Sequence, residues 1–216
     1  PLADMFPRFR KSLSTLNALP LSVYKKSIIK DAITEVLEGT NFENDFPPFK
    51  LHSYNFEEIS RLDDESIPRY LFYRYRYDTF PKRLKLDSFP PCLQIEPASI
   101  CNYRCLFCYQ IDEEFTSKAN GMMGMMSLDL FKRIIDQAEG EIEAVTVASR
   151  GEPLVCPDIE EMLRYAGGKF LAFKLNTNAW FLDERKCHTI LDSGVNNLVF
   201  SVDAATGAYK WHFQTT

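Results

Sequence analysis

Residues 101–108 have the sequence CNYRCLFC, which places three cysteines within eight positions at the spacing Cys-x3-Cys-x2-Cys. An aromatic residue, Phe107, stands directly before the last of them. Thiolates are ligands for soft metals and for iron–sulfur clusters. Three thiols crowded into one short loop suit a metal centre better than three separate disulfides. The loop therefore predicts a metal centre in the downstream half of the chain.

The composition sets the broad class. The chain has 216 residues, of which 45% are hydrophobic, and a formal net charge of −5. This length allows one large domain or two small ones with a sizeable core. The charge gives no basic footprint, so nucleic acid is not indicated as a partner. No run of about eighteen apolar residues predicts a membrane span, and no secretory signal is recognisable. The chain begins with Pro1 instead of Met, so we expect a fragment or a processed product.

The remaining cysteines are Cys92, Cys156 and Cys187, which makes six in total. An even number could indicate a disulfide framework, but such frameworks belong to short secreted domains with weak cores. We therefore expect a reducing, cytoplasmic location.

Residues 1–90 form the first of two predicted regions. A helix is predicted over Leu21–Leu37, ending at Gly39. The run Tyr70–Tyr77 alternates aromatics with arginines, which indicates a half-buried strand or a helix with one aromatic face. A packing role in a core is favoured over a stacking platform for bases or sugars. Two prolines, Pro90 and Pro91, then mark a boundary. We expect a mainly helical N-terminal extension of unknown role.

Residues 91–216 show strands alternating with helices, which argues for a parallel sheet with right-handed crossovers. The repeat spacing is typical of a partial (β/α) barrel, with about four β/α units. Predicted strands cover Leu93–Ile95, Ala144–Ala148, Phe170–Leu175 and Leu198–Val202. Predicted helices begin at Ser127, at Asp158 with a capping box to Glu161, and at Asp183.

The carboxyl ends of these strands are where we expect the chemistry. In β/α barrels, active sites lie on the loops that follow the strands. The four predicted loops begin near Ser99, Ser149, Asn176 and Ser201, and each carries polar, small or metal-binding residues. The first of them contains the three cysteines.

Two kinds of metal centre fit the cysteine loop. Three thiolates could hold three irons of a [4Fe–4S] cluster and leave the fourth iron open for chemistry. Alternatively, Cys92 could join them as the fourth ligand of a structural zinc. The resulting Cys-x8-Cys-x3-Cys-x2-Cys spacing lacks the paired Cys-x2-Cys knuckles of zinc ribbons. It also differs from the common ferredoxin spacings. The cluster is therefore favoured over zinc.

The Cys-x3-Cys-x-aromatic-Cys loop resembles that of the radical S-adenosylmethionine (SAM) superfamily. The resemblance implies that Cys101, Cys105 and Cys108 ligate a [4Fe–4S] cluster whose open iron chelates SAM. It implies an enzyme that cleaves SAM reductively to a 5′-deoxyadenosyl radical, which abstracts a hydrogen atom from an unidentified substrate. Cofactors carry this chemistry and the protein orients them. An electron donor such as a flavodoxin or ferredoxin is implied as a partner.

The other strand-end loops resemble further motifs of this family. The second loop contains a Gly-Glu-Pro-Leu form, in which Gly151 and Glu152 would contact the ammonium of SAM, although Arg150 stands where the family usually has glycine. The alternative is that Glu152 is a solvated loop acid. The implied cofactor contacts of the remaining loops are Phe107 beside the adenine, and Asn178, Ser201 and Asp203 near the ribose or substrate. Each polar residue could instead serve a turn, and Phe107 could be a core contact.

The resemblance covers residues 91–209 and has a limit. The family's usual core has six β/α units, whereas this chain stops after its fourth predicted strand. We therefore expect a truncated catalyst, with any SPASM-type auxiliary-cluster domain beyond Thr216. A non-catalytic iron–sulfur electron carrier and a zinc-stabilised interaction module stay open as alternatives. The scaffold hosts many reactions, so it does not choose a substrate.

Overall fold

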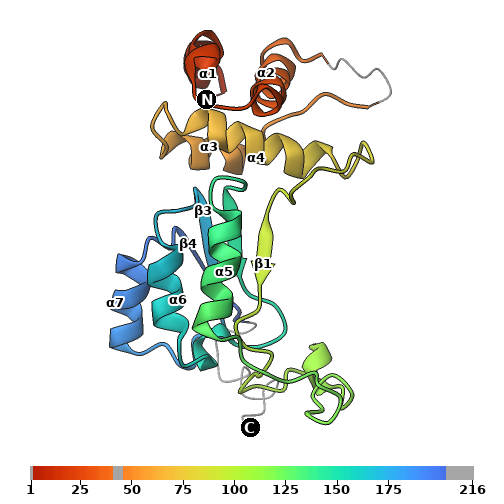
Figure 1. The fold of residues 1–216 in the computed structure, drawn as a ribbon, viewed down its shortest axis with the longest axis vertical. Coiled ribbons are helices and arrows are strands. Elements are labelled where there is room, and N and C mark those ends of the chain that lie inside the picture. Colours follow the sequence, from red (N-terminus) through yellow and green to blue (C-terminus); the bar gives the residue numbers. More distant parts are fainter. Residues whose placement is uncertain (1, 41–45, 203–216) are drawn as a thin grey trace. The chain divides into compact units, whose positions relative to one another are not determined.

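A computed structural model describes residues 2–40 and 46–202 (Figure 1). The chain divides into two compact units, Pro1–Pro91 and Cys92–Thr216. Within the described residues, no helix is long and apolar enough to cross a membrane.

The first unit is built from helices. They are α1 (Leu2–Thr15), the short 3-10 helix η1 (Leu16–Ala18), α2 (Val23–Glu38), α3 (Ser53–Ser60) and α4 (Ile67–Thr79). Helix α2 confirms the predicted helix, beginning two residues later than expected. The Ser22 hydroxyl caps it by accepting from the Lys25 amide, and Gly39 ends it with a left-handed φ of 67°. Glycine reaches that conformation without a steric penalty, so the sequence signal for the end was correct.

Helix α4 decides between the two alternatives for the aromatic run. The strand interpretation is wrong, because residues 67–79 form one continuous helix. Arg74 and Arg76 lie among the buried residues of this helix. The Arg76 guanidinium stacks over the Phe72 ring at 4.5 Å and pairs with Asp87 at 2.6 Å. Burying both arginines removes the polar face that would have marked an amphipathic helix.

The second unit contains a four-stranded parallel sheet in the order β1-β2-β3-β4. The strands are β1 (Leu93–Ile95), β2 (Ala144–Val147), β3 (Ala172–Thr177) and β4 (Asn197–Phe200), and the connecting helices are α5 (Leu128–Ala138), α6 (Ile159–Ala166) and α7 (Glu184–Asp192). These three helices stand side by side along the sheet (Figure 1). Short 3-10 helices, η2 (Tyr109–Ile111) and η3 (Pro153–Val155), lie in the first two loops. This arrangement confirms the predicted partial α/β barrel.

The core of this unit lies between the sheet and its helices. Val145 and Val147 of β2 and Phe173 and Leu175 of β3 are fully buried, as is Phe131 of α5. The intervening strand residues are less buried, following the two-residue period of a strand. Because successive side chains alternate between the faces, this core fixes the strand register and the height at which each strand ends.

Three local predictions need correction. The fourth strand, β4, runs over Asn197–Phe200 and so ends two residues earlier than expected. The third strand lies two residues later than expected, so Asn176 and Thr177 belong to β3 and its loop begins at Asn178. The capping box predicted at Asp158 is absent, because the Asp158 side chain makes no cap bond to α6. Its backbone angles, φ −89° and ψ 5°, are close to helical instead of the extended conformation from which an N-cap side chain reaches back.

Candidate functional site

The cysteine loop follows β1 and orders its own sulfur atoms through backbone amides. The Tyr103 amide donates to Cys101 Sγ at 3.4 Å, and the Gln110 amide donates to Cys108 Sγ at 3.5 Å. The Cys108 amide donates to the Cys105 carbonyl oxygen at 2.9 Å, which closes a turn between these two cysteines. All three cysteines are half-buried. N–H donors directed at sulfur are a known means of tuning iron–sulfur centres.

The second loop passes directly against the entry to the cysteine loop at Gly151. A Cβ on Gly151 would lie 1.9 Å from the Ala98 carbonyl oxygen, so no other residue fits there. The Glu152 amide donates to the Ile100 carbonyl oxygen at 2.9 Å. Ser149, just before, has a φ of 128°, in a region that side chains rarely adopt and that is often found at functional sites. The structure thus gives Gly151 a packing role, and its predicted ligand contact stays a prediction.

Glu152 is 2% exposed, so the solvated-acid alternative is wrong. Its carboxylate accepts from the Leu154 amide at 3.0 Å, the Thr177 hydroxyl at 2.6 Å and the Asn178 amide at 2.7 Å. These bonds tie the second loop to the end of β3. Burial raises the pKa of Glu152 despite the three donors, which act to lower it. No cation pairs with this carboxylate in the described part of the chain.

The third loop contacts the cysteine loop through Asn178. Its Nδ2 donates to Asn102 Oδ1 at 3.0 Å and lies 3.8 Å from Cys101 Sγ. The Tyr103 and Trp180 rings meet edge to face, with centroids 5.8 Å apart. The structure therefore brings Asn178 and Glu152 together with the cysteine loop, as the strand-end argument predicted.

The remaining predicted site residues are Phe107, Ser201 and Asp203. Phe107 is 67% exposed, so its alternative as a core contact is wrong. Ser201 follows β4, is exposed, and donates its amide to the Thr177 carbonyl oxygen at 2.8 Å. Asp203 lies outside the described residues.

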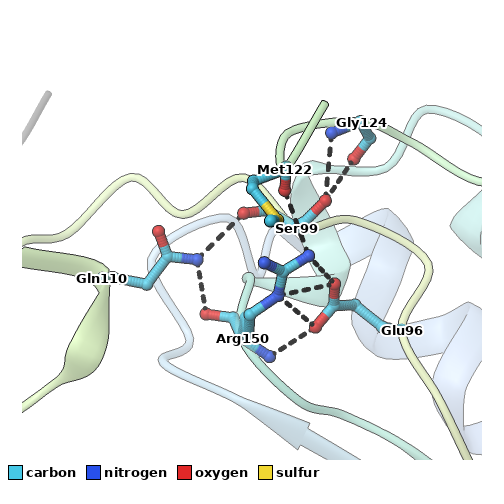
Figure 2. Close-up of polar contacts among 6 residues, drawn as sticks. All are labelled: Glu96, Ser99, Gln110, Met122, Gly124 and Arg150. Atoms are coloured by element: carbon cyan, nitrogen blue, oxygen red, sulfur yellow. Dashed lines mark hydrogen bonds and ion pairs between the residues drawn. The ribbon is translucent and has the colours of Figure 1, made fainter. Parts of the chain in front are cut away.

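A polar network that was not predicted from the sequence joins the two ends of the cysteine loop to the second loop (Figure 2). Arg150 pairs with Glu96, with Nη2 at 3.0 Å from Oε1, and its backbone amide donates to Glu96 Oε2 at 2.7 Å. Arg150 Nη2 also donates to the Met122 carbonyl oxygen at 3.1 Å. Gln110 Nε2 donates to the carbonyl oxygens of Ser99 and Arg150, each at 2.9 Å. The one signal available in the sequence was Arg150 in the place of a usual glycine.

Comparison with protein families places residues 95–215, more than half of the chain, in the Radical SAM superfamily. The chain belongs to the radical SAM superfamily. The family predicted from the cysteine loop is thereby confirmed.

Two curated relatives resemble this radical SAM chain in sequence. One is the tungsten-containing aldehyde ferredoxin oxidoreductase cofactor-modifying protein of Pyrococcus furiosus, 32% identical over 116 residues that cover 51% of this chain and 30% of the relative. The other is the AdoMet-dependent heme synthase of Methanosarcina barkeri, 27% identical over 131 residues that cover 61% of this chain and 36% of the relative. The chain thus spans about a third of the length of the curated relatives it matches.

A solved structure of BtrN in complex with AdoMet and 2-DOIA is also similar. It shares 20% sequence identity, with a TM-score of 0.46, over 59% of this chain and 56% of that one.

The donor chemistry of the three loop cysteines in this radical SAM chain fits thiolate ligation of a soft metal or an iron–sulfur cluster. In the described residues no three His, Cys, Asp or Glu side chains converge on one point as a single metal ion requires, and none of the six cysteines forms a disulfide. Burial raises the pKa of the Cys101 thiol, and the nearby Glu152 charge adds to this rise. A thiolate at Cys101 therefore gains from an arriving cation, since metal binding requires the deprotonated form.

Proposed function

We propose that this chain is a radical SAM enzyme in which Cys101, Cys105 and Cys108 bind a [4Fe–4S] cluster. The proposal assigns SAM to the adjoining strand-end loops and a hydrogen atom of an unidentified substrate as the target. Residues 91–216 would carry this chemistry, with residues 1–90 as an extension outside it. The observation that carries the proposal is the Cys-x3-Cys-x-Phe-Cys loop at the end of β1 in a chain of this family.

A bound cluster would supply the electron for cleaving a carbon–sulfur bond of SAM, with methionine and a 5′-deoxyadenosyl radical as the products. The protein's part is to hold the reactants and their charges. Three cysteine ligands leave one iron without a protein ligand, where the amino and carboxylate groups of SAM would bind. Glu152, a buried carboxylate without a cation among the described residues, would complement the positive charge of SAM. A one-electron donor such as a flavodoxin or ferredoxin would supply the reducing equivalent.

The remaining predicted contacts belong to the same proposal. Asn178 is close enough to Cys101 to border the cluster on the third-loop side. Exposed Phe107 offers an apolar ring on the cysteine loop for the adenine, since aromatic faces stack on bases. Gly151, Ser201 and Asp203 would complete the pocket. A compartment that keeps thiols reduced, such as the cytoplasm, suits the three cysteines.

The test is anaerobic reconstitution of the purified protein with iron and sulfide. We expect broad visible absorbance from a [4Fe–4S] cluster and, with dithionite and SAM, formation of 5′-deoxyadenosine. Cys101→Ala, Cys105→Ala and Cys108→Ala should each abolish the cluster. Cys92→Ala is the matched control, because the proposal gives this cysteine no iron, and it should retain the cluster.

Three outcomes would contradict the proposal in different ways. Loss of metal on Cys92→Ala, with zinc in anaerobically purified protein, would favour the zinc-stabilised module. A cluster whose spectrum ignores added SAM would favour an electron carrier. A reconstituted protein that binds SAM but yields no 5′-deoxyadenosine would remove the catalytic claim.

A further inference from the structure

We propose that Gln110 is a positioning residue that closes the base of the cysteine loop and so fixes the three thiols relative to the second loop. This inference rests on the proposed function for its consequence, but its geometry does not depend on any bound group. The residues that carry it are Gln110, Ser99 and Arg150 (Figure 2).

Gln110 lies where the end of the cysteine loop comes back beside its beginning. Ser99 stands two residues before the first cysteine, and Gln110 stands two residues after the last. The Gln110 side chain donates to the Ser99 carbonyl oxygen at 2.9 Å, so one hydrogen bond joins the two ends of the segment that contains all three cysteines. Its backbone amide donates to Cys108 Sγ. The same residue therefore holds both the loop base and the last sulfur.

The same amide group also reaches the second loop. Its Nε2 donates to the Arg150 carbonyl oxygen, again at 2.9 Å. Arg150 is itself fixed by Glu96 at the end of β1, through both its guanidinium and its backbone amide. The next residues along are Gly151 and Glu152. Gln110 thus holds the cysteine loop in a fixed position relative to the segment that carries the buried carboxylate of Glu152.

The chemistry of the contact requires an N–H donor at this position. Both partners are backbone carbonyl oxygens, which accept only, and Gln110 is 2% exposed, so water is not a ready substitute. The side-chain oxygen Oε1 has no hydrogen-bond partner among the residues that the structure describes. The side chain therefore acts through its NH2 group alone. Methionine would fill the same space without donors, and glutamate would direct a carboxylate at two carbonyl oxygens.

Ser99 and Gly124 add a second tie that does not involve Gln110. The Ser99 hydroxyl donates to the Gly124 carbonyl oxygen at 3.2 Å and accepts from the Gly124 amide at 3.0 Å. These two bonds hold Gly124, in the segment that follows the cysteine loop, against Ser99 at the start of the loop. Loss of the Gln110 side chain should consequently loosen the cysteine loop without releasing Ser99 or unfolding the sheet.

The test compares Gln110→Met and Gln110→Glu with the wild type and with Gln137→Met. Gln137 is a matched control because its Nε2 also donates to a backbone carbonyl oxygen, that of Arg133 at 3.0 Å, but on the exposed surface of α5. The first measurement is the rate at which a chelator removes iron from the reconstituted protein. We expect a rise of about tenfold for Gln110→Met, the effect of losing an outer-shell partner of a metal ligand, and a larger rise for Gln110→Glu. Gln137→Met should match the wild type.

Two further measurements separate positioning from a general loss of stability. The thermal midpoint of Gln110→Met should fall modestly, because two carbonyl oxygens lose their donor. The electron paramagnetic resonance spectrum of the reduced cluster, and its change on adding SAM, should also differ, which a loss of stability alone would not cause. Gln110→Asn, which can reach only one carbonyl oxygen, should give an intermediate iron-release rate.

Amide hydrogen exchange in the metal-free protein distinguishes failure of this inference from failure of the proposed function. We expect Gln110→Met to accelerate exchange within residues 100–110 but not within β2. Unchanged exchange there, or wild-type iron release and spectra in both Gln110 variants, would overturn the positioning role. If the wild type bound no cluster and exchange still rose in Gln110→Met, the positioning role would stand and the proposed function would fall.

Discussion

Glu35 in the first unit and Glu152 in the second are both almost completely buried, and their carboxylates are satisfied in different ways. Glu35, in the first unit, is 1% exposed and receives a bidentate guanidinium from Arg83, with Nη2 at 2.9 Å from Oε2. The Tyr75 hydroxyl and the Phe49 amide each add a bond of 2.6 Å. Glu152, in the second unit, is 2% exposed and receives only neutral donors. One carboxylate has its counter-charge built in, and the other does not.

The difference separates a structural ion pair from a buried carboxylate for which we propose a positively charged ligand. Burying an ion is costly unless it is paired and hydrogen-bonded. Glu35 meets both conditions within its own unit, far along the chain from the cysteines. Glu152 meets only the second, and it stands beside the loop that carries them. A buried carboxylate without a counter-charge either holds a proton or is completed by a cation, and under the proposed function the positive charge of SAM would be that cation.

The largest expected effect is that of removing the built-in cation. Arg83→Met leaves Glu35 buried with a charge and no guanidinium, so we expect the first unit to lose about 3–5 kcal/mol of stability. Urea unfolding followed by amide hydrogen exchange in α4 measures this loss.

Lys82→Met is the control for this change, because Lys82 is the adjacent residue and is exposed. It should leave the free energy of unfolding nearly unchanged. If Arg83→Met proved no more destabilising than Lys82→Met, the Glu35–Arg83 pair would not be the support that its geometry indicates.

A smaller effect is expected when Glu152 loses one of its neutral donors. Thr177→Val keeps the side-chain shape and removes the hydroxyl that donates to Oε1 at 2.6 Å. We expect the second unit to lose about 2 kcal/mol, the range for a hydrogen bond to a charged group. Trp180 fluorescence during urea unfolding is a suitable measurement.

Thr146→Val, on the neighbouring strand β2, is the matched control, because the Thr146 hydroxyl makes no hydrogen bond to any described residue. An equal loss from both variants would show that the Thr177 bond contributes little.

The sequence predicted the second unit well because its signals are local. Ser127 caps α5 as expected, by accepting from the Leu130 amide. Asp183, where the third helix was predicted to begin, caps α7 by accepting from the Lys186 amide. Each strand is a short segment that contains apolar residues, such as Val145 in β2 and Phe173 in β3, and the cysteine spacing lies within eight residues. Periodicity and capping are properties of neighbouring residues, so they can be read without knowing the fold.

The features that the sequence did not predict depend on distant partners. Arg76 reads as a surface residue until its pairing with Asp87 and its stacking on Phe72 are known. Gln110 reads as a loop amide, because the Arg150 carbonyl oxygen that it binds lies 40 positions away. The Glu96–Arg150 pair spans 54 positions. Such contacts follow from how strands assemble, and residue type alone does not determine them.

The next prediction tests whether a ligand supplies the charge that Glu152 lacks. In the reconstituted protein, Glu152→Gln should weaken SAM binding about tenfold, or about 1.4 kcal/mol, because a neutral amide attracts the positive charge of SAM less strongly than a carboxylate does. Equilibrium binding of SAM measures the change. Glu161→Gln, an exposed acid on α6, should bind like the wild type, and an unchanged affinity in Glu152→Gln would remove Glu152 from the site.

The smallest expected effect is a difference in pH dependence between the two units of the cluster-free protein. Burial raises the pKa of Glu152 above its ordinary value of 4.5. The folded state then holds a proton that the unfolded chain has already released, so the second unit should lose stability as pH rises from 4.5 through the raised pKa. In the first unit, burial of Asp87 works to raise its pKa, but the Tyr24 hydroxyl and the Arg76 guanidinium outweigh it and hold the pKa below 3.8. The contribution of Asp87 to stability is complete above pH 3.8 and is lost only as pH falls below it.

The measurement is hydrogen exchange in β3 and in α4 between pH 4 and pH 7, with Glu152→Gln as the reference. The stability of β3 should decline with rising pH in the wild type and not in the variant. A β3 stability with the same pH dependence in both proteins would mean that the three donors offset the burial of Glu152, and the contrast between the two glutamates would then be one of contacts alone.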